Sequence, residues 1–347
     1  MGIQSKKKVA VLGATGIIGQ TLIRLLEDHP WFTIDALVAS ESSAGKKYSE
    51  KCRWILKDPM PESVGELQIL DTSADLDAHI LFSGLDSNVA EEIELDFKEK
   101  GHVIVSNASS HRMASDVPLV IPEVNPDHLQ LVNYGGKGGW IVTNPNCSAV
   151  VIALALAPIS EEYGIERMYV TTMQSSSGAG YPGTPFLDLN GNVIPFIEGE
   201  EQKIGAELKK ILGTMENGSI NDNPFKVSVQ TNRVAVSYGH MASIFLFTKS
   251  APDVENIKKI LNDFSGLPQE RKLPTAPEQP IYVEENEYHP QPRLDVDREN
   301  GMAISVGRIE NVDENGIRLV ALGHNTIRGG AGAALLNAEL LHSEGLI

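Results

Sequence analysis

Cys147 stands where a polar, turn-prone segment, TNPN, meets an apolar run. The Asn-Pro-Asn segment 144–146 favours a turn and the Ala-, Leu- and Ile-rich residues after it can form a helix, so we predict Cys147 at a helix N-terminus. Unpaired N–H groups and the helix dipole at that position would lower the pKa of the thiol and could hold an oxyanion. This stretch alone fits a nucleophilic cysteine and a small buried Cys at the start of a core helix equally well.

Two later stretches carry polar residues that could act with such a thiol. Gln174 ends a probable strand before a Gly-rich loop. Arg233 and His240 are seven residues apart, so on one straight strand they would face opposite sides, and a break at Gly239 is needed for both to reach one site. A lone His is often structural, but beside a candidate thiolate it is also a candidate acid or base.

The segment 197–212 is predicted as a helix with an apolar face that includes Ile204 and Leu208. Four residues after Ile197 and three before Ile204, Glu201 falls on that face, and an inward-facing carboxylate is unusual unless it is paired. Lys203 could pair with Glu207 on the solvated face or could have a functional role, and the sequence leaves both readings open.

The motif GATGIIG lies between a predicted strand, residues 7–13, and a predicted helix, residues 16–30. Its glycines, Gly13, Gly16 and Gly19, suit a tight turn that holds a pyrophosphate at a helix N-terminus, although a purely structural turn is the alternative. The second strand, residues 33–40, ends without the acidic residue that binds the ribose 2′-hydroxyl in NAD sites. We therefore predict NADP, with NAD possible because Glu41 is adjacent. The residues assigned to the 2′-phosphate are Ser40, Ser42, Ser43 and Lys46.

The order of these elements predicts an α/β fold. A strand at 79–84, a helix near 88–100 and a strand at 102–109 continue the alternation, which is typical of a Rossmann-type doubly wound parallel sheet. Alternating residues at 226–248 predict a mainly antiparallel sheet in an α+β second domain for catalysis and dimerisation. We predict domains at 1–148, joined by a C-terminal helix 325–347, and at 149–324, with 265–298 as a surface excursion or interface arm.

Composition narrows the class of protein. The 347 residues are 41% hydrophobic and 22% charged, which suits two ordinary globular domains. The two cysteines, Cys52 and Cys147, form no CxxC pair, so neither disulfides nor a metal site is predicted. A net charge of −17 disfavours nucleic acid and anionic membranes as partners. With no signal-peptide core and no membrane-spanning run, we expect a cytoplasmic protein that binds small molecules.

Several motifs in order along the chain, SNASSHRM, TNPNCS, QSSSGAGYPG, NVIPFIEGEEQKI, RVAVSYGH and HNTIRGGAGAALLNAELL, resemble the aspartate-semialdehyde dehydrogenase family in its archaeal and fungal branch. The resemblance implies that Cys147 is the nucleophile, Gln174 its positioning partner and His240 the acid/base. It implies that Arg112 and Lys203 bind phosphate, and that Glu201 and Arg233 bind the amino and carboxylate ends of the substrate. The predicted cofactor site further includes Thr15, Ile17, Ser177, Gly178, Asn325 and Thr326, the last two near the nicotinamide.

The implied reaction is the reversible NADPH-dependent reduction of L-aspartyl 4-phosphate to aspartate semialdehyde and phosphate, through a Cys147 thioester. It belongs to the biosynthesis of lysine, threonine, methionine and isoleucine, and the resemblance implies a homodimer or homotetramer. Many relatives have an Arg where this chain has Ser42 or Ser43, so strict NADP preference stays open. The alternatives are a malonyl-CoA reductase-type acyl-thioester reductase and a non-catalytic dinucleotide-sensing protein.

Overall fold

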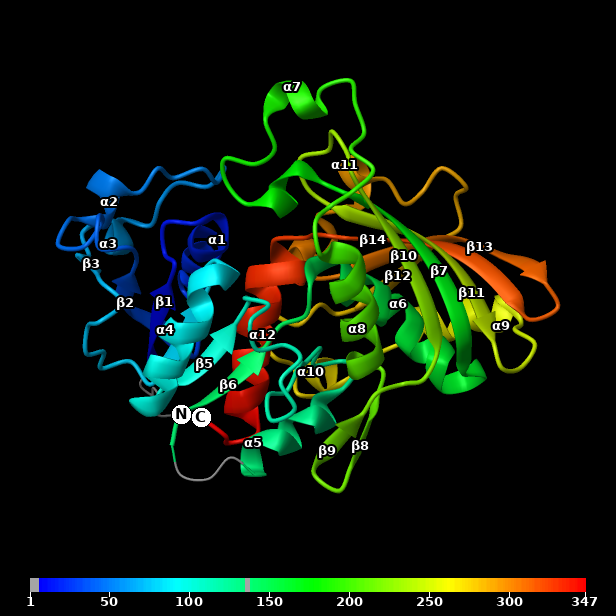
Figure 1. The fold of residues 1–347 in the computed structure, drawn as a ribbon, viewed down its shortest axis with the longest axis horizontal. Helices are drawn as coiled ribbons and strands as arrows, with labels where there is room; N and C mark the ends of the chain where they lie inside the picture. The colour runs from blue at the N-terminus through cyan, green and yellow to red at the C-terminus, as the bar shows by residue number, and fades with distance from the viewer. Residues whose placement is uncertain (1–5, 135–137) are drawn as a thin grey trace.

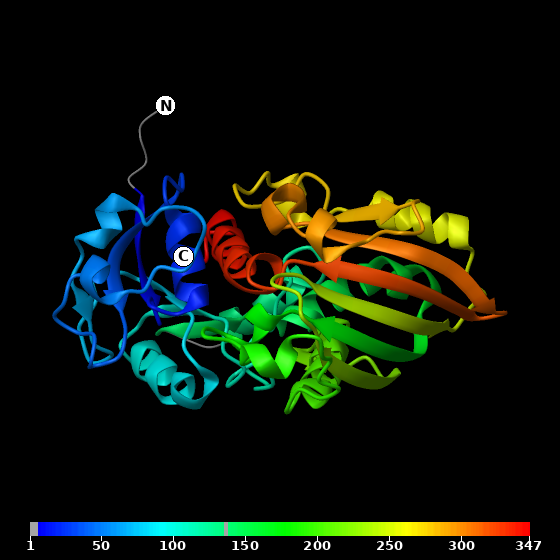
Figure 2. The same cartoon turned by 90° about the horizontal axis from the view of Figure 1, so that it is seen from above.

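The computed structural model describes residues 6–134 and 138–347. Two lobes lie side by side, each built on a six-stranded sheet, with the helix α12 (Gly332–Ser343) between them (Figure 1, Figure 2). The C-terminal segment thus returns to the lobe formed by the first part of the chain.

The N-terminal sheet has the strand order β3-β2-β1-β4-β5-β6, and all its pairings are parallel. This is the order of the Rossmann fold, so the predicted fold of the first domain is confirmed. Its main elements are β1 (Lys7–Leu12), α1 (Ile17–Leu26), β2 (Phe32–Val38), β3 (Ile69–Leu70), β4 (Ile80–Ser83), α4 (Ser87–Glu99), β5 (Val103–Ser106) and β6 (Trp140–Thr143). Short helices connect them: α2 (Tyr48–Lys51), α3 (Glu62–Gly65), the 3-10 turn η1 (Pro126–Leu129) and α5 (Gln130–Tyr134).

Helices cover both faces of this sheet. Along β1, Val9 and Val11 join the core that includes α1 and α12, while Ala10 and Leu12 join a second core with Phe97 of α4. Side chains alternate between the two faces along a strand, and helices cover both faces. These strands are therefore almost continuously apolar.

The second sheet has the order β10-β7-β11-β14-β13-β12. Three of its neighbouring pairs are antiparallel, whereas β10 with β7 and β12 with β13 are parallel, so the sheet is mixed but mainly antiparallel. The strands are β7 (Ile165–Gln174), β10 (Lys226–Arg233), β11 (His240–Thr248), β12 (Ile281–Glu284), β13 (Ile304–Asp313) and β14 (Gly316–Gly323). The helices α6 (Cys147–Tyr163), α8 (Glu200–Ile211) and α9 (Val254–Asn262) share its main core.

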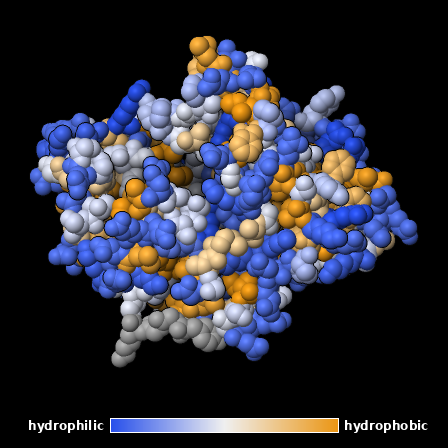
Figure 3. Space-filling view, in the orientation of Figure 1, coloured by the Kyte–Doolittle hydropathy of each residue, from blue (hydrophilic) through white to orange (hydrophobic). Residues whose placement is uncertain are grey.

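Smaller elements complete this lobe. The 3-10 turn η2 (Ser176–Ala179) follows β7, and α7 (Phe186–Leu189) stands out at the top of Figure 1. Phe186 and Leu187 are exposed there, and Figure 3 shows hydrophobic side chains at the same place. The remaining elements are the hairpin β8 (Thr214–Glu216) with β9 (Ser219–Asn221), the short helices α10 (Leu267–Glu270) and α11 (Pro292–Asp295), the 3-10 turn η3 (Arg298–Gly301) and the π-helical turn η4 (Ile327–Ala331).

The strands predicted within 226–248 are β10 and β11, which lie on opposite sides of β7. One expectation about the second domain needs correction. The stretch 265–298 is more than a surface excursion, since it contributes β12 to the sheet, and Leu273 packs in the core of the first domain. The predicted domain boundary at 148/149 stays a prediction.

No helix within residues 6–134 and 138–347 is long and apolar enough to cross a membrane. Within the same ranges, no group of three or more His, Cys, Asp or Glu residues is placed to hold a metal ion.

Candidate active site

Cys147 is the first residue of α6, as predicted. The side-chain oxygen of Asn146 accepts hydrogen bonds from the N–H groups of Ser148 at 2.8 Å and Ala149 at 3.3 Å. This is the N-cap arrangement that fixes the start of a helix. The helix then runs through the core, with residues 149–156 buried, so the position of the thiol is set by the packing of the whole element.

The pKa of this thiol corrects a prediction. Burial raises the pKa of Cys147 above its ordinary value, and the charge of Glu200 raises it further. The charges of Arg112 and Arg233 and a hydrogen bond from the N–H of Ser148 oppose this rise without cancelling it. The predicted lowering of the pKa is therefore wrong for the free protein, because desolvation outweighs the helix terminus. The thiol is protonated at neutral pH.

Three predicted residues meet at one edge of the second sheet. Arg233 ends β10 and is paired in register with Gln174, which ends β7, and His240 begins β11 on the other side of β7. Gly239, at φ +98°, turns the chain into β11. The predicted convergence of Arg233 and His240 is confirmed, although it is achieved by two strands that flank a third.

His240 is buried and in its neutral form. The pKa of its imidazole is lowered to about 3, mainly by burial and then by the charge of Arg233. Its Nδ1 accepts a hydrogen bond from the N–H of Ser175 at 3.1 Å, so the ring proton lies on Nε2. Among the described residues Nε2 has no hydrogen-bond partner. The ring therefore presents one unused N–H donor.

The turn η2 lies directly against this edge. A Cβ on Gly178 would come within 2.8 Å of both Arg233 Nη1 and His240 Nε2, so only glycine fits there. Arg233 Nη1 also donates to the carbonyl of Ser175 at 2.9 Å. The turn is thus packed on the two side chains that the sequence assigns to the substrate and to proton transfer.

Asn325 fixes that turn. Its Oδ1 accepts hydrogen bonds from Gly239 N at 2.9 Å and Ser175 Oγ at 3.1 Å, and its Nδ2 donates to Ser177 Oγ at 2.9 Å. The structure therefore brings three predicted cofactor residues, Ser177, Gly178 and Asn325, to His240. Thr326 is buried next to Asn325 in the chain.

The carboxylate of helix α8 that faces Cys147 is Glu200, not Glu201. Glu200 Oε2 accepts hydrogen bonds from Asn146 Nδ2 at 2.8 Å and Gln174 Nε2 at 3.4 Å. Glu201 turns to the sheet, where its Oε1 accepts from Thr231 N at 3.1 Å. The expected inward position of Glu201 is therefore seen, three residues before the buried Ile204 and paired with the sheet backbone, whereas its assignment to the substrate stays a prediction. The feature of the sequence that could have indicated Glu200 is its position three residues before Lys203.

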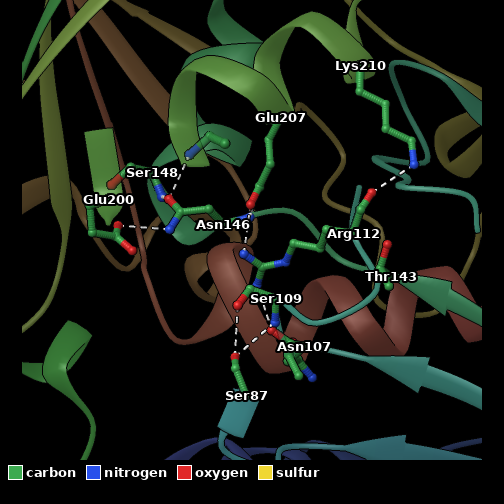
Figure 4. Close-up of polar contacts among 12 residues, drawn as sticks. Ser87, Asn107, Ser109, Arg112, Thr143, Asn146, Ser148, Glu200, Glu207 and Lys210 are labelled. Atoms are coloured by element: carbon green, nitrogen blue, oxygen red, sulfur yellow. Dashed lines mark hydrogen bonds and ion pairs between the residues drawn. The ribbon is translucent and has the colours of Figure 1, made fainter. Parts of the chain in front are cut away.

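Arg112 is held by Glu207, as Figure 4 shows. Arg112 Nη1 lies 3.0 Å from Glu207 Oε1, and Nη2 donates to the carbonyl of Asn107 at 2.6 Å. Lys203 is exposed, and no ion pair joins it to Glu207 among the residues described, so the solvated-pair reading is wrong. The sequence does not predict Glu207 as a buried partner of Arg112, because the residues around Glu207 do not indicate that an arginine 95 residues away contacts it.

The glycine motif forms the expected turn between β1 and α1. Gly13 has φ +73°, and a Cβ there would lie 2.6 Å from the carbonyl oxygen of Gly84 on the neighbouring strand segment. A Cβ on Gly19 would lie 2.3 Å from Gly13 O, so the helix can approach the strand only without a side chain. Gly16 caps α1 without a side-chain hydrogen bond, which leaves the first-turn N–H groups free for an anion. Thr15 and Ile17 flank this N-terminus.

The serine cluster follows β2 as predicted. Ser40 Oγ lies 3.0 Å from Ser42 Oγ and 3.5 Å from Ser43 Oγ, in a turn closed by Ser43 N and Ser40 O. Lys46 is exposed nearby in the chain. The three hydroxyls are close enough to contact one phosphate.

Comparison with known proteins identifies the family. Residues 8–132 match the family described as semialdehyde dehydrogenase, NAD binding domain, and residues 156–328 match semialdehyde dehydrogenase, dimerisation domain. The chain is 46% identical to an aspartate-semialdehyde dehydrogenase of Methanothermobacter thermautotrophicus, over 96% of this chain and 98% of that protein. An aspartate-semialdehyde dehydrogenase of Schizosaccharomyces pombe is 42% identical, over 98% and 99% of the two chains. The chain belongs to the aspartate-semialdehyde dehydrogenase family.

Solved structures of aspartate-semialdehyde dehydrogenases agree with this assignment. A structure from Candida albicans, determined with NADP, superposes with a TM-score of 0.91 at 40% identity and covers 99% of this chain and 100% of that one. A structure from Vibrio cholerae, complexed with ASA, gives a TM-score of 0.80 at 26% identity, over 98% and 99% of the chains. The predictions of this family, of its two-domain α/β fold and of an NADP-dependent oxidoreductase are confirmed.

Proposed function

We propose that the chain catalyses the reversible reduction of L-aspartyl 4-phosphate to aspartate semialdehyde and phosphate, with the acyl group carried on Cys147. The observation that carries the proposal is the charge around one thiol. Arg112, from the first domain, shares Glu207 with the backbone N–H of Asn146, next to Cys147. Arg233, at the end of β10, is paired in register with Gln174, whose amide lies 3.4 Å from Glu200, the partner of Asn146. Both guanidinium charges oppose the rise in the pKa of the thiol. A substrate with a phosphate at one end and a carboxylate at the other matches two separate cations.

The N-terminus of α1 fits the pyrophosphate of NADP. The first-turn N–H groups carry no side-chain cap, and Gly13 and Gly19 leave no room for side chains between the turn and its neighbours. The hydroxyls of Ser40, Ser42 and Ser43 fit the 2′-phosphate, and Ser177, Gly178 and Asn325 fit the nicotinamide end. When bound, the cofactor supplies hydride to the acyl carbon.

The two ends of the substrate are assigned to different residues. Arg112 Nε is buried and has no hydrogen-bond partner within the described residues, so we assign it as a donor for phosphate. Lys203 lies on α8 four residues before Glu207, the partner of Arg112, and we assign it to phosphate as well. Arg233 holds the carboxylate. Glu200 takes the role that the sequence assigned to Glu201 and binds the substrate ammonium, because its carboxylate faces Cys147.

Two covalent steps take place on Cys147, the formation of a thioester and its reduction to the aldehyde. The thiolate attacks the acyl carbon and the carbon–oxygen bond to phosphate breaks, so that a thioester forms and the thiol proton leaves with the phosphate. After hydride transfer, the oxyanion re-forms the carbonyl as the carbon–sulfur bond breaks, which releases the aldehyde, and the thiolate takes a proton to restore the thiol. His240 Nε2–H is placed as the proton donor to this thiolate. The N–H groups of Ser148 and Ala149 donate to Asn146 Oδ1, so the N–H of Cys147 is the group at the start of α6 that we assign to the oxyanion. Gln174, linked to Glu200, positions the substrate side of the site.

One assay tests this proposal against the acyl-thioester reductase reading. NADP reduction by aspartate semialdehyde is measured in separate reactions with inorganic phosphate, with coenzyme A, and with neither acceptor. We expect turnover only with phosphate. Turnover with coenzyme A and none with phosphate contradicts the proposal and supports the alternative. No turnover with any acceptor, in protein that binds NADP, contradicts the proposal.

The assembly and cellular role follow from the same proposal. Within residues 6–134 and 138–347, one face of the second sheet carries no helix, and Tyr169 and Phe245 on neighbouring strands of that face are 51% and 39% exposed. We assign this face to a homodimer, which can associate further into a tetramer. The enzyme acts in the cytoplasm, in the biosynthesis of lysine, threonine, methionine and isoleucine, with small molecules as its other partners.

A further inference from the structure

We propose that Glu207 is a positioning residue that sets the geometry of the phosphate-binding arginine against the nucleophile. The inference rests on the proposed function, in which Arg112 binds phosphate and Cys147 attacks. Glu207 itself faces neither ligand, and it acts through the groups that it holds.

One carboxylate joins the two halves of the reaction centre. Glu207 Oε1 lies 3.0 Å from Arg112 Nη1, and Oε2 accepts a hydrogen bond from the backbone N–H of Asn146 at 2.5 Å. Asn146 is the N-cap residue immediately before Cys147. Figure 4 shows Glu207 descending from α8 between these two groups. The separation between Arg112 and the nucleophile is therefore fixed by a single side chain.

The remaining bonds of Arg112 decide which donor is left for phosphate. Nη2 uses one N–H for the carbonyl of Asn107 and Nη1 uses one for Glu207, whereas Nε is buried without a partner among the described residues. With both terminal nitrogens held, the guanidinium cannot rotate freely, so the direction of Nε is set by these two contacts. Loss of Glu207 would release one of them.

Helix α8 also holds the backbone around Arg112. Lys210 Nζ, one turn after Glu207, donates to the carbonyls of Arg112 at 2.7 Å, Ala114 at 2.8 Å and Val117 at 2.9 Å. Burial lowers the pKa of this ammonium to about 8. The same helix face thus fixes the side chain of Arg112 through Glu207 and its main chain through Lys210.

A positioning role and a structural role predict different kinetics. A buried carboxylate that only supports the fold costs stability when it is changed, without selecting one substrate. A positioning residue alters the affinity for the ligand of the group that it orients. Glu207→Gln keeps the size of the side chain, but its amide cannot accept hydrogen bonds from both Arg112 Nη1 and Asn146 N with equal geometry.

The experiment measures NADP reduction by aspartate semialdehyde while phosphate is varied. For Glu207→Gln we expect the KM for phosphate to rise about tenfold or more, with the KM for NADP changed less than about twofold. The matched control is Glu339→Gln. Glu339 is another fully buried carboxylate, which lies in α12 and binds His29 and Thr275. The control should leave the KM for phosphate unchanged.

The double variant with Arg112→Leu separates the possible failures. If Glu207 acts through Arg112, its effect on the KM for phosphate should largely disappear in the Arg112→Leu background. A raised KM in Arg112→Leu but not in Glu207→Gln overturns the inference and leaves the proposed function standing. An unchanged KM in Arg112→Leu contradicts the phosphate end of the proposed function itself.

Two further variants cover the case in which Glu207→Gln does not fold. Glu207→Asp keeps the charge at a shorter reach, and Lys210→Met removes the three backbone contacts while Glu207 stays. Each should raise the KM for phosphate several-fold relative to the Glu339→Gln control. Wild-type phosphate kinetics in both variants contradicts the inference.

Discussion

The reactive thiol shows how competing local effects decide a single property. Its place at a helix start was predicted from the sequence, because turn formers precede an apolar run. The sign of its pKa shift was not, because desolvation depends on side chains from α8, β10 and the first domain that close around it. Sequence patterns locate a residue on an element, while the charges facing it come from the tertiary structure.

The raised pKa of Cys147 predicts how alkylation depends on pH. Because the folded protein favours the neutral thiol, the rate of iodoacetamide labelling at Cys147 should increase about tenfold per pH unit through pH 7 to 9, without a plateau. Mass spectrometry of the Cys147 peptide gives the rate. A plateau with a midpoint clearly below about 8.5, the ordinary pKa of a thiol, contradicts this prediction.

Cys147→Ala should abolish turnover and leave NADP binding intact.

Adjacent glutamates provide a matched pair of variants. Glu200→Gln should lower kcat/KM for aspartate semialdehyde about tenfold to a hundredfold, because it removes a charge that faces the substrate. Glu201→Gln should have little effect, since its side chain faces the backbone of Thr231 on the sheet. Steady-state kinetics of both variants checks the assignment. A larger loss in Glu201→Gln would restore the assignment made from the sequence.

At the scale of elements, segments with a clear apolar run and flanking turn signals were predictable. The positions of β1, α1, β2 and α4, and of the short β4 and β5, follow from such runs. The two-residue β3 is too short for a period to emerge, and β3 and β6 pair with β2 and β5 through contacts that no local pattern encodes. The placement of β10 and β11 around β7 is likewise a matter of long-range pairing, which no local pattern encodes.

The turn η4, before α12, is tied to the first domain by a buried ion pair. Arg328 Nη1 and Nη2 lie 2.9 Å and 2.6 Å from the two carboxylate oxygens of Glu123, and both side chains are almost fully buried. Removing one partner leaves the other charge buried and unpaired, so Glu123→Gln should reduce the free energy of unfolding by about 3 to 5 kcal/mol. Urea unfolding measures the change.

The exposed pair of Lys258 with Glu255 is the control for that measurement. Because water screens an exposed pair, Glu255→Gln should leave the unfolding midpoint essentially unchanged. Equal shifts in the two variants contradict the account of η4 as an anchored element.

At the scale of the whole molecule, the uncovered face of the second sheet predicts self-association. Phe245→Asp places a charge in the middle of that face and should convert the homo-oligomer to smaller species, as measured by analytical ultracentrifugation. Phe186→Asp, on the exposed α7, is the matched control and should leave the mass unchanged. An unchanged mass in Phe245→Asp, or dissociation in the control alone, places the interface elsewhere.

The central claim is that the acyl group is carried on Cys147 and released by phosphate. The most direct test mixes enzyme, aspartate semialdehyde and NADP without phosphate and follows NADPH formation in the first turnover. We predict a burst of about one NADPH per active site together with an aspartyl adduct on the Cys147 peptide, followed by steady turnover when phosphate is added. Steady NADPH formation without phosphate, or a burst that leaves Cys147 unmodified, contradicts the claim.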